Sequence, residues 1–102
     1  KADAKVYFNA TAFEVTNLIN AISPSPAAYA ELFGAPVNLL KAEAVEGAGS
    51  SGEVLSVDKT GAIIACGDGA VKIKIMQFAG GKALTAADVF NGRKLKAGDK
   101  FD

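Results

Sequence analysis

The stretch that decides the fold is CGDGAVKIKIMQFAGGKALTAADVFNGRKLKAGDKF, which runs from Cys66 to Phe101. Its Gly-Asp-Gly start predicts a tight turn into a strand over Ala70–Phe78. Within that strand apolar and basic residues alternate with period two, so we expect one face to be buried and the other to face solvent. The residues expected in the core are Val71, Ile73 and Ile75.

A short helix follows the strand. Thr85 lies three residues before Asp88, a spacing that predicts an N-cap, and Gly92 predicts the end of the helix. We expect Val89 and Phe90 to be its buried pair. Gly98 to Phe101 could add a last edge strand.

Upstream of this stretch, short apolar segments alternate with turn signals. Strands are predicted over Val37–Val45, Glu53–Val57 and Ala62–Cys66, with a flexible loop over Gly47–Gly52. The sequence Asp58–Gly61 predicts a tight turn with Gly61 in the left-handed conformation. Strands this short, separated by glycine-rich turns, indicate a small antiparallel sheet or barrel, and closure would remove exposed edges.

The N-terminal region predicts a short extended anchor over Val6–Phe8 and then a helix. Thr11 and Glu14 have the spacing of a capping box. An apolar stripe of helical period follows, and Pro24 should stop the helix. The stripe consists of Val15, Leu18, Ile19 and Ile22.

The segment 25–34 (SPAAYAELFG) supports two interpretations. Local rules favour a short helix, with Ser25 as cap, Pro26 in the first turn and Gly34 as terminator. We nevertheless expect a strand, because tertiary pairing commonly overrides local propensity.

Composition limits the class of protein. A chain of 102 residues, half of them hydrophobic, makes one globular domain, and no apolar run approaches the roughly 18 residues that span a membrane. Because there is no histidine and one cysteine, a structural zinc site is excluded and a self-contained enzyme is disfavoured. Cys66 is expected to be a buried strand residue in a reducing cytoplasm. Since the chain opens on Lys1 without a signal peptide, we expect a fragment of a longer cytoplasmic protein.

Charge is distributed unevenly although the net charge is zero. Residues 1–71 carry four basic and eight acidic groups, whereas residues 72–102 carry seven basic and three acidic groups. Lys72 and Lys74 should stand about 6.7 Å apart on the outer face of their strand, close to the spacing of phosphates along a nucleic-acid strand. The predicted phosphate-binding residues are Lys72, Lys74, Lys82, Arg93, Lys94 and Lys96. A solvated strand face and a complemented helix dipole are the structural alternatives.

Other candidate sites carry less weight. Tyr29, Phe33 and Phe78 could stack on unpaired bases, but aromatic residues in so small a core usually pack. Asp68, between two glycines, is better explained by a side chain that bonds its own backbone than by catalysis or metal binding.

The order and spacing of these motifs resemble the C-terminal domain of methionyl-tRNA formyltransferases over almost the whole chain. The matching pieces are Ala21–Pro26, Gly52–Leu55, Cys66–Gly69, Gln77–Lys82, Thr85–Phe90, Gly92-Arg93 and Gly98-Asp99. The resemblance implies a mainly β fold: an OB-like open Greek-key barrel of five to six antiparallel strands with an N-terminal and a short C-terminal helix. It favours a strand over residues 26–33, paired through Gly34-Ala35-Pro36.

The resemblance also implies a division of labour. Residues 1–10 would end an interdomain linker and residues 11–102 would form the barrel, while a Rossmann-type catalytic domain lies outside this chain. That domain would transfer a formyl group from 10-formyltetrahydrofolate to methionyl-tRNA. The barrel would hold initiator tRNA by its phosphate backbone, with no catalytic residue, cofactor, metal or membrane contact of its own.

The sequence departs from the family at several positions. The family often has arginine at Asn20, tryptophan at Ser25, glycine at Ala27, an acidic residue at Tyr7 and proline at Ser51. Loss of an arginine at Asn20 removes one candidate RNA contact. Two alternatives therefore stay open: the structural barrel of a formyltransferase or formyltetrahydrofolate hydrolase with a small-molecule substrate, and a free-standing interaction module.

Overall fold

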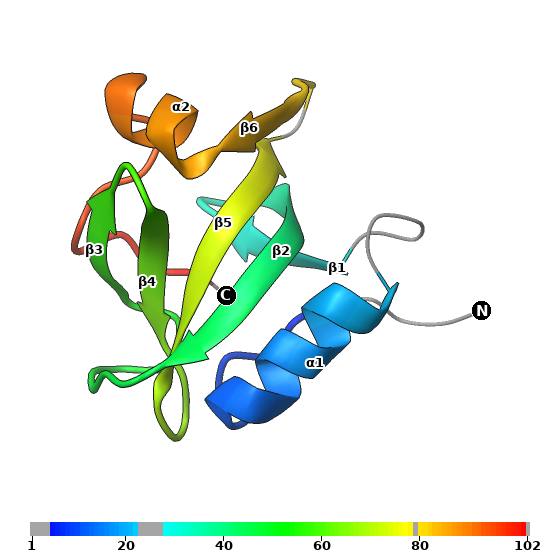
Figure 1. Ribbon diagram of the computed structural model, residues 1–102, viewed down its shortest axis with the longest axis vertical. Helices are drawn as coiled ribbons and strands as arrows, with labels where there is room; N and C mark the ends of the chain where they lie inside the picture. The colour runs from blue at the N-terminus through cyan, green and yellow to red at the C-terminus, as the bar shows by residue number, and fades with distance from the viewer. Residues whose placement is uncertain (1–4, 23–27, 79, 102) are drawn as a thin grey trace.

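The computed structural model describes residues 5–22, 28–78 and 80–101. In this part of the chain six antiparallel strands form one curved sheet, with a helix near each end of the chain (Figure 1). The mainly β class is confirmed. In chain order the elements are α1 (Ala12–Ile22), β1 (Ala28–Leu32), β2 (Ala35–Val45), β3 (Val54–Asp58), β4 (Gly61–Ala65), β5 (Ala70–Phe78), β6 (Ala83–Thr85) and α2 (Ala86–Asn91).

The strand order β1-β2-β5-β4-β3 is that of a Greek key. Consecutive hairpins join β3, β4 and β5, and β2 lies against the far edge of β5. The C-terminal tail connects the two outer strands, because Phe101 bridges Leu32 at the end of β1 and Lys100 bridges Glu53 beside β3. The expected strand over Gly98–Phe101 is therefore present only as isolated bridges, which link the open edges of the sheet.

Helix α1 begins as its capping box predicts. The Thr11 N–H donates to Glu14 Oε1 over 3.1 Å, and the Glu14 N–H donates to Thr11 Oγ1 over 3.1 Å. Val15 and Ile19 from the predicted stripe are buried and Leu18 is half-buried. The side chain of Ile22 and the predicted stop at Pro24 lie outside the described residues. Before the helix, Val6 and Phe8 are buried, and the Val6 N–H donates to the Tyr29 carbonyl.

The segment after residue 27 is a strand, not a helix. Residues 28–32 pair with residues 35–39 of β2. This pairing supplies tertiary hydrogen bonds, which local propensity does not take into account. The predicted turn through Gly34-Ala35-Pro36 is wrong, since Ala35 and Pro36 already pair with Leu32 and Glu31. The turn residues are Phe33 and Gly34, with φ of 52° and 81°. Two positive φ values in a two-residue loop match the twist of the flanking strands.

Strand β5 has the predicted bounds but not the predicted alternation. Val71 and Ile73 are fully buried, whereas Ile75 is half-buried and Met76 takes the inner position with 0% exposure. The ladder with β2 shifts register on both sides of Lys41, and Lys74 has no partner in it. A bulged strand turns its later side chains to the opposite face, so Met76 replaces Ile75 in the core.

Two turn predictions need correction. Gly61 has no positive φ and lies within β4, opposite Asp58. A Cβ atom at Gly61 would overlap the side chain of Lys72, so glycine here makes room for that lysine. At α2, the cap is confirmed because Thr85 Oγ1 accepts from the Asp88 N–H. Val89 is buried, but Phe90 is 42% exposed and is not part of the core.

The strand β6 was not predicted. It has three residues, none fully buried, and pairs with the outer half of β5. Because β4 pairs only with residues 70–73 of β5 and β6 with residues 75–77, the two share one edge of β5. The sheet divides at Lys74, between these two partners.

Candidate nucleic-acid interface

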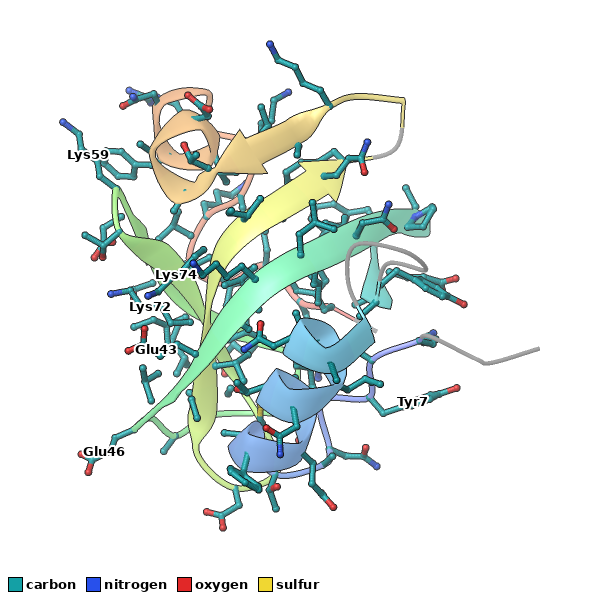
Figure 2. All side chains as sticks on the ribbon, turned by 45° about the vertical axis from the view of Figure 1, so that its right-hand side comes forward. Tyr7, Glu43, Glu46, Lys59, Lys72 and Lys74 are labelled. Carbon is teal, nitrogen blue, oxygen red and sulfur yellow. The ribbon has the colours of Figure 1, made fainter. Side chains whose placement is uncertain are left out.

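The two lysines of β5 lie on the outer face of the sheet, as the alternation predicts. Figure 2 shows Lys72 and Lys74 on the same side of the sheet as Glu43. Lys74 Nζ lies 2.6 Å from Glu43 Oε1, and both side chains are partly exposed. Glu43 is also the partner of Lys72 in the ladder between β2 and β5. The carboxylate therefore lies between the two cations.

This arrangement lowers the local positive charge. The hydrogen bond from Lys74, then its charge, and after these the charge of Lys72 lower the pKa of Glu43 below its ordinary value of 4.5. The Glu43 carboxylate therefore stays ionised at neutral pH. A phosphate that approached Lys74 would compete with a carboxylate already in place. Of the two β5 lysines, Lys72 is the one without a carboxylate within 4.0 Å among the described residues.

The stem of Lys72 lies across the start of β4. Gly61 leaves the space for its Cγ, Cδ and Cε atoms. The neighbouring hairpin is tied by Asp58, whose Oδ1 accepts from the Thr60 N–H over 2.8 Å and from the Thr60 hydroxyl over 2.6 Å. These bonds lower the pKa of Asp58, with a smaller contribution from Lys72. Because Asp58 is occupied by its own turn, Lys59 at the tip extends freely into solvent (Figure 2).

The second basic group follows α2. Arg93 and Lys94 are exposed and make no ion pair within the described ranges. Lys96 differs, because its Nζ lies 3.9 Å from Asp99 Oδ1 and its N–H donates to Asp99 Oδ2 over 3.1 Å. Asp99 is buried and fixes the Lys96 backbone, whereas the Lys96 side chain remains 82% exposed.

Arg93 has an unusual backbone. Its φ is 54°, whereas Gly92 before it has φ of −82°. A non-glycine residue in the left-handed region costs about 1–2 kcal/mol. At this helix end Arg93, and not Gly92, therefore takes the left-handed conformation that usually requires glycine. The Arg93 N–H donates to the Phe90 carbonyl over 3.2 Å, which fixes the arginine beside the end of α2.

The six predicted residues do not form one cluster. Lys72 and Lys74 lie on β5, Lys82 is exposed in the turn between β5 and β6, and Arg93, Lys94 and Lys96 follow α2. The element pair β6 and α2 separates Lys82 from Arg93. Two of the six, Lys74 and Lys96, lie against carboxylates, and the other four make no ion pair in the part of the chain that the structure describes.

Sequence reasoning missed three residues near these cations. Glu43 was not connected with Lys74, because the two are neighbours only through the register of β2 and β5. Lys59 belongs to the acidic part of the sequence, residues 1–71. It lies at the tip of the β3–β4 hairpin, however, and this hairpin lies beside α2, which precedes the basic segment (Figures 1 and 2). Asn20 was regarded as a lost RNA contact, yet its amide binds β2. Asn20 Nδ2 donates to the Ala42 carbonyl over 2.8 Å, and the Ala42 N–H donates to Asn20 Oδ1 over 3.0 Å.

The predicted stacking residues do not form a platform together. Tyr29 is half-buried, Phe78 is half-buried against the core, and Phe33 is 78% exposed at the β1–β2 turn. The Asp68 carbonyl, rather than its side chain, accepts a hydrogen bond from the Ala12 N–H over 2.9 Å. Cys66 is buried and free, and burial raises its pKa to about 11.

The described residues contain neither a metal-ligand cluster nor a helix that could span a membrane. Within residues 5–22, 28–78 and 80–101, no three His, Cys, Asp or Glu side chains are grouped so that they could hold a metal ion. Of the helices in these same ranges, none is long and apolar enough to cross a membrane.

Comparison with known proteins identifies the family. A sequence profile described as "Formyl transferase, C-terminal domain" matches residues 1–94. The chain belongs to the formyl transferase C-terminal domain family. Among curated relatives of this formyl transferase C-terminal domain, the methionyl-tRNA formyltransferase of Pseudomonas entomophila (strain L48) is 43% identical over 101 residues. That of Dechloromonas aromatica (strain RCB) is 41% identical over 102 residues.

The formyl transferase C-terminal domain is a small part of these relatives. The matches cover 98% and 100% of this chain but 33% of each relative, so the chain spans about a third of their length. Among solved structures, HypX from Aquifex aeolicus in complex with tetrahydrofolic acid has a TM-score of 0.71 at 26% identity, covering 85% of this chain and 16% of HypX. A multiply substituted HypX variant has a TM-score of 0.74 at 24% identity, covering 97% of this chain and 19% of that chain, which supports the fold alone.

Proposed function

We propose that this domain is the tRNA-holding, C-terminal part of a methionyl-tRNA formyltransferase. The observation that carries the proposal is the similarity of nearly the whole chain to proteins of that name, at 41% and 43% identity in the two relatives named above. Of the six predicted phosphate-binding residues, four are exposed or partly exposed and make no ion pair in the described structure, which supports a role in binding a polyanion.

The chemistry would reside in the preceding domain of the longer polypeptide. There a formyl group would pass from 10-formyltetrahydrofolate to the amino group of initiator methionyl-tRNA, in the cytoplasm. The tetrahydrofolic acid complex of HypX supports a folate as the ligand class of such longer proteins. We place the interdomain linker within residues 1–10 and the barrel within residues 11–102, and we assign no catalytic residue, cofactor or metal to the barrel.

The barrel would contribute electrostatic attachment. Lys72, Lys82, Arg93 and Lys94 are the residues that we expect to contact tRNA phosphates. Lys74 and Lys96 should contribute less, because Glu43 and Asp99 already neutralise them. Contacts to phosphates position an RNA without reading its sequence, which suits an A-form helix whose deep major groove side chains cannot read.

The proposal is tested by the salt dependence of tRNA binding. Fluorescence anisotropy of labelled tRNA, titrated with the 102-residue chain between 50 and 300 mM KCl (roughly the range over which phosphate contacts are screened), gives the slope of log K against log salt. With three or four phosphates neutralised, the slope should be about −3. Binding that does not change with salt would count against the proposal.

A matched pair of substitutions locates the contact. Lys94→Ala should reduce the steepness of the slope by about 0.9, the value for one lost phosphate contact. Lys100→Ala removes another exposed charge, at the residue that bridges Glu53 beside β3, and should leave the slope unchanged. Equal effects of the two variants would mean that only net charge matters.

One observation favours a second candidate function. The Lys74–Glu43 and Lys96–Asp99 contacts, with a net charge of zero, are also what a purely structural barrel would contain. Such a barrel would pack on the catalytic domain of a formyltransferase or formyltetrahydrofolate hydrolase with a small-molecule substrate. This alternative predicts that Lys82→Ala and Lys94→Ala leave formylation of methionyl-tRNA by the full-length enzyme unchanged.

A further inference from the structure

A groove lies between β3 and the end of α2, and its lining includes Arg93 and Lys96 of the basic segment described above. Its volume is about 630 Å³, within the roughly 300–1,000 Å³ of small-ligand sites. The walls are mostly apolar, and the two cations on its lining come from the segment after α2. Its main residues are Leu55, Val57, Phe90, Leu95, Arg93 and Lys96. None of the residues that line it is a carboxylate.

Phe90 is the accessible aromatic of this groove. It was predicted to be buried with Val89, but Val89 alone enters the core, and Phe90 remains 42% exposed. The groove wall beneath it is completed by Leu95, which is 3% exposed, and by Val57, which is half-buried against the core. A phenyl ring is therefore presented beside a hollow with an apolar floor.

The cationic rim is held by the backbone. Arg93 has the left-handed φ of 54°, a conformation that glycine would adopt without strain, and its N–H is bonded to the Phe90 carbonyl. Strained residues of this kind persist where surrounding structure fixes them, and they concentrate at binding sites. Lys96 is partly neutralised by Asp99, so Arg93 is the main anion partner. Lys59, at the tip of the β3–β4 hairpin, extends on the same side as α2 (Figure 2).

We propose that this groove receives one unpaired nucleotide of an RNA, with the base against Phe90 and its phosphate at Arg93. The inference rests on the proposed function and adds a site to it. An unpaired base needs an apolar or π surface for its face and polar groups for its edge, which Ser56 and Asn91 on the lining can provide. Cations and no carboxylate line the groove, which favours a polyanion over a basic or neutral peptide as the partner.

The test compares two labelled RNAs with the 102-residue chain. One is a blunt RNA duplex, and the other is the same duplex with an unpaired 3′ extension. The wild-type chain should bind the extended RNA more tightly. Phe90→Leu keeps an apolar side chain but removes the ring, and should reduce affinity for the extended RNA by about 5- to 100-fold while leaving the blunt duplex unaffected.

Two further variants separate binding from stability. Phe33→Leu removes a more accessible ring, 78% exposed against 42% for Phe90, at the β1–β2 turn and should leave both affinities unchanged. Arg93→Gly removes the strain of a non-glycine residue in the left-handed region, so Tm should not fall. The salt slope for the extended RNA should nevertheless become shallower by about 0.7, the value for one lost contact to a single-stranded phosphate.

The outcomes are distinct. A preference for the extended RNA that survives in Phe90→Leu, or that falls equally in Phe33→Leu, would overturn the groove proposal and leave tRNA holding intact. Equal, salt-dependent binding of both RNAs by the wild-type chain would do the same, and would favour a protein partner for the groove. Failure of the wild-type chain to bind either RNA would refute both proposals.

Discussion

Replacement of Asn20 by alanine should destabilise the domain, because this side chain substitutes for a missing strand partner. Strand β1 pairs with residues 35–39 of β2 and leaves the rest of that edge without a neighbouring strand. There Asn20 accepts from the Ala42 N–H over 3.0 Å and donates to the Ala42 carbonyl over 2.8 Å. A primary amide carries the donor and acceptor that a peptide group would have offered.

The expected magnitude follows from these two bonds. A hydrogen bond contributes a net 0.5–1.5 kcal/mol, so two contribute about 2 kcal/mol. Alanine gains about half a kcal/mol from its higher helix propensity. Asn20→Ala should therefore lower the free energy of unfolding by about 1.5 kcal/mol. Asn17, on the same helix, is exposed like Asn20 but does not bond to β2, so Asn17→Ala gains only the propensity and should raise the free energy of unfolding slightly.

Thermal unfolding followed by circular dichroism measures the difference between the two variants. A difference of about 2 kcal/mol in a domain of this size corresponds to roughly 8–16 °C in Tm, with Asn20→Ala the lower. Urea titration should give the same order with an unchanged m-value. If both variants melt within about 2 °C of each other, water replaces the amide at no cost and the reasoning is refuted.

Two further outcomes are expected. Glu43→Gln releases Lys74, so the slope of log K against log salt for tRNA should become steeper by about 0.9. Glu46→Gln is the charge-matched control, because Glu46 is exposed and makes no ion pair within the described residues, and it should not change the slope. Equal slopes in the two variants would show that Lys74 makes no phosphate contact. Cys66 should react slowly with a thiol reagent at pH 8 in the folded chain and rapidly in urea, because burial raises its pKa from 9.0 to about 11. Since the unfolded thiol ionises first, stability should fall as pH rises from about 9 toward 11, and rapid labelling of the folded chain would contradict the buried thiol.

The sequence predicted the elements whose signals are local. The Thr11–Glu14 box and the Thr85 cap act over three residues, and both are present as predicted. The bounds of β5 followed from its turn and its alternation. Such signals are readable because backbone sterics and capping hydrogen bonds depend on residues within one turn.

Predictions that required a partner strand were less accurate. Residues 28–32 lie in a segment that satisfied local helix rules, yet they form β1, as the family resemblance implied, since β2 is available to pair with them. Ile75 and Phe90 were assigned to the core from local pattern, but the bulge at Lys74 and the packing of α2 on β3 place them elsewhere. The bulge arises from the register between β2 and β5, and the sequence of β5 alone does not predict it.

The amino-acid sequence by itself determined a small β fold with two capped helices and a basic C-terminal third. The tertiary structure alone decided which of those cations stay free, because ion pairs join residues that strand register brings together. Glu43 and Lys74 are 31 positions apart in the chain, and only the ladder between β2 and β5 makes them neighbours. Local signals fix where strands and helices begin, whereas the electrostatic surface depends on contacts made across the sheet.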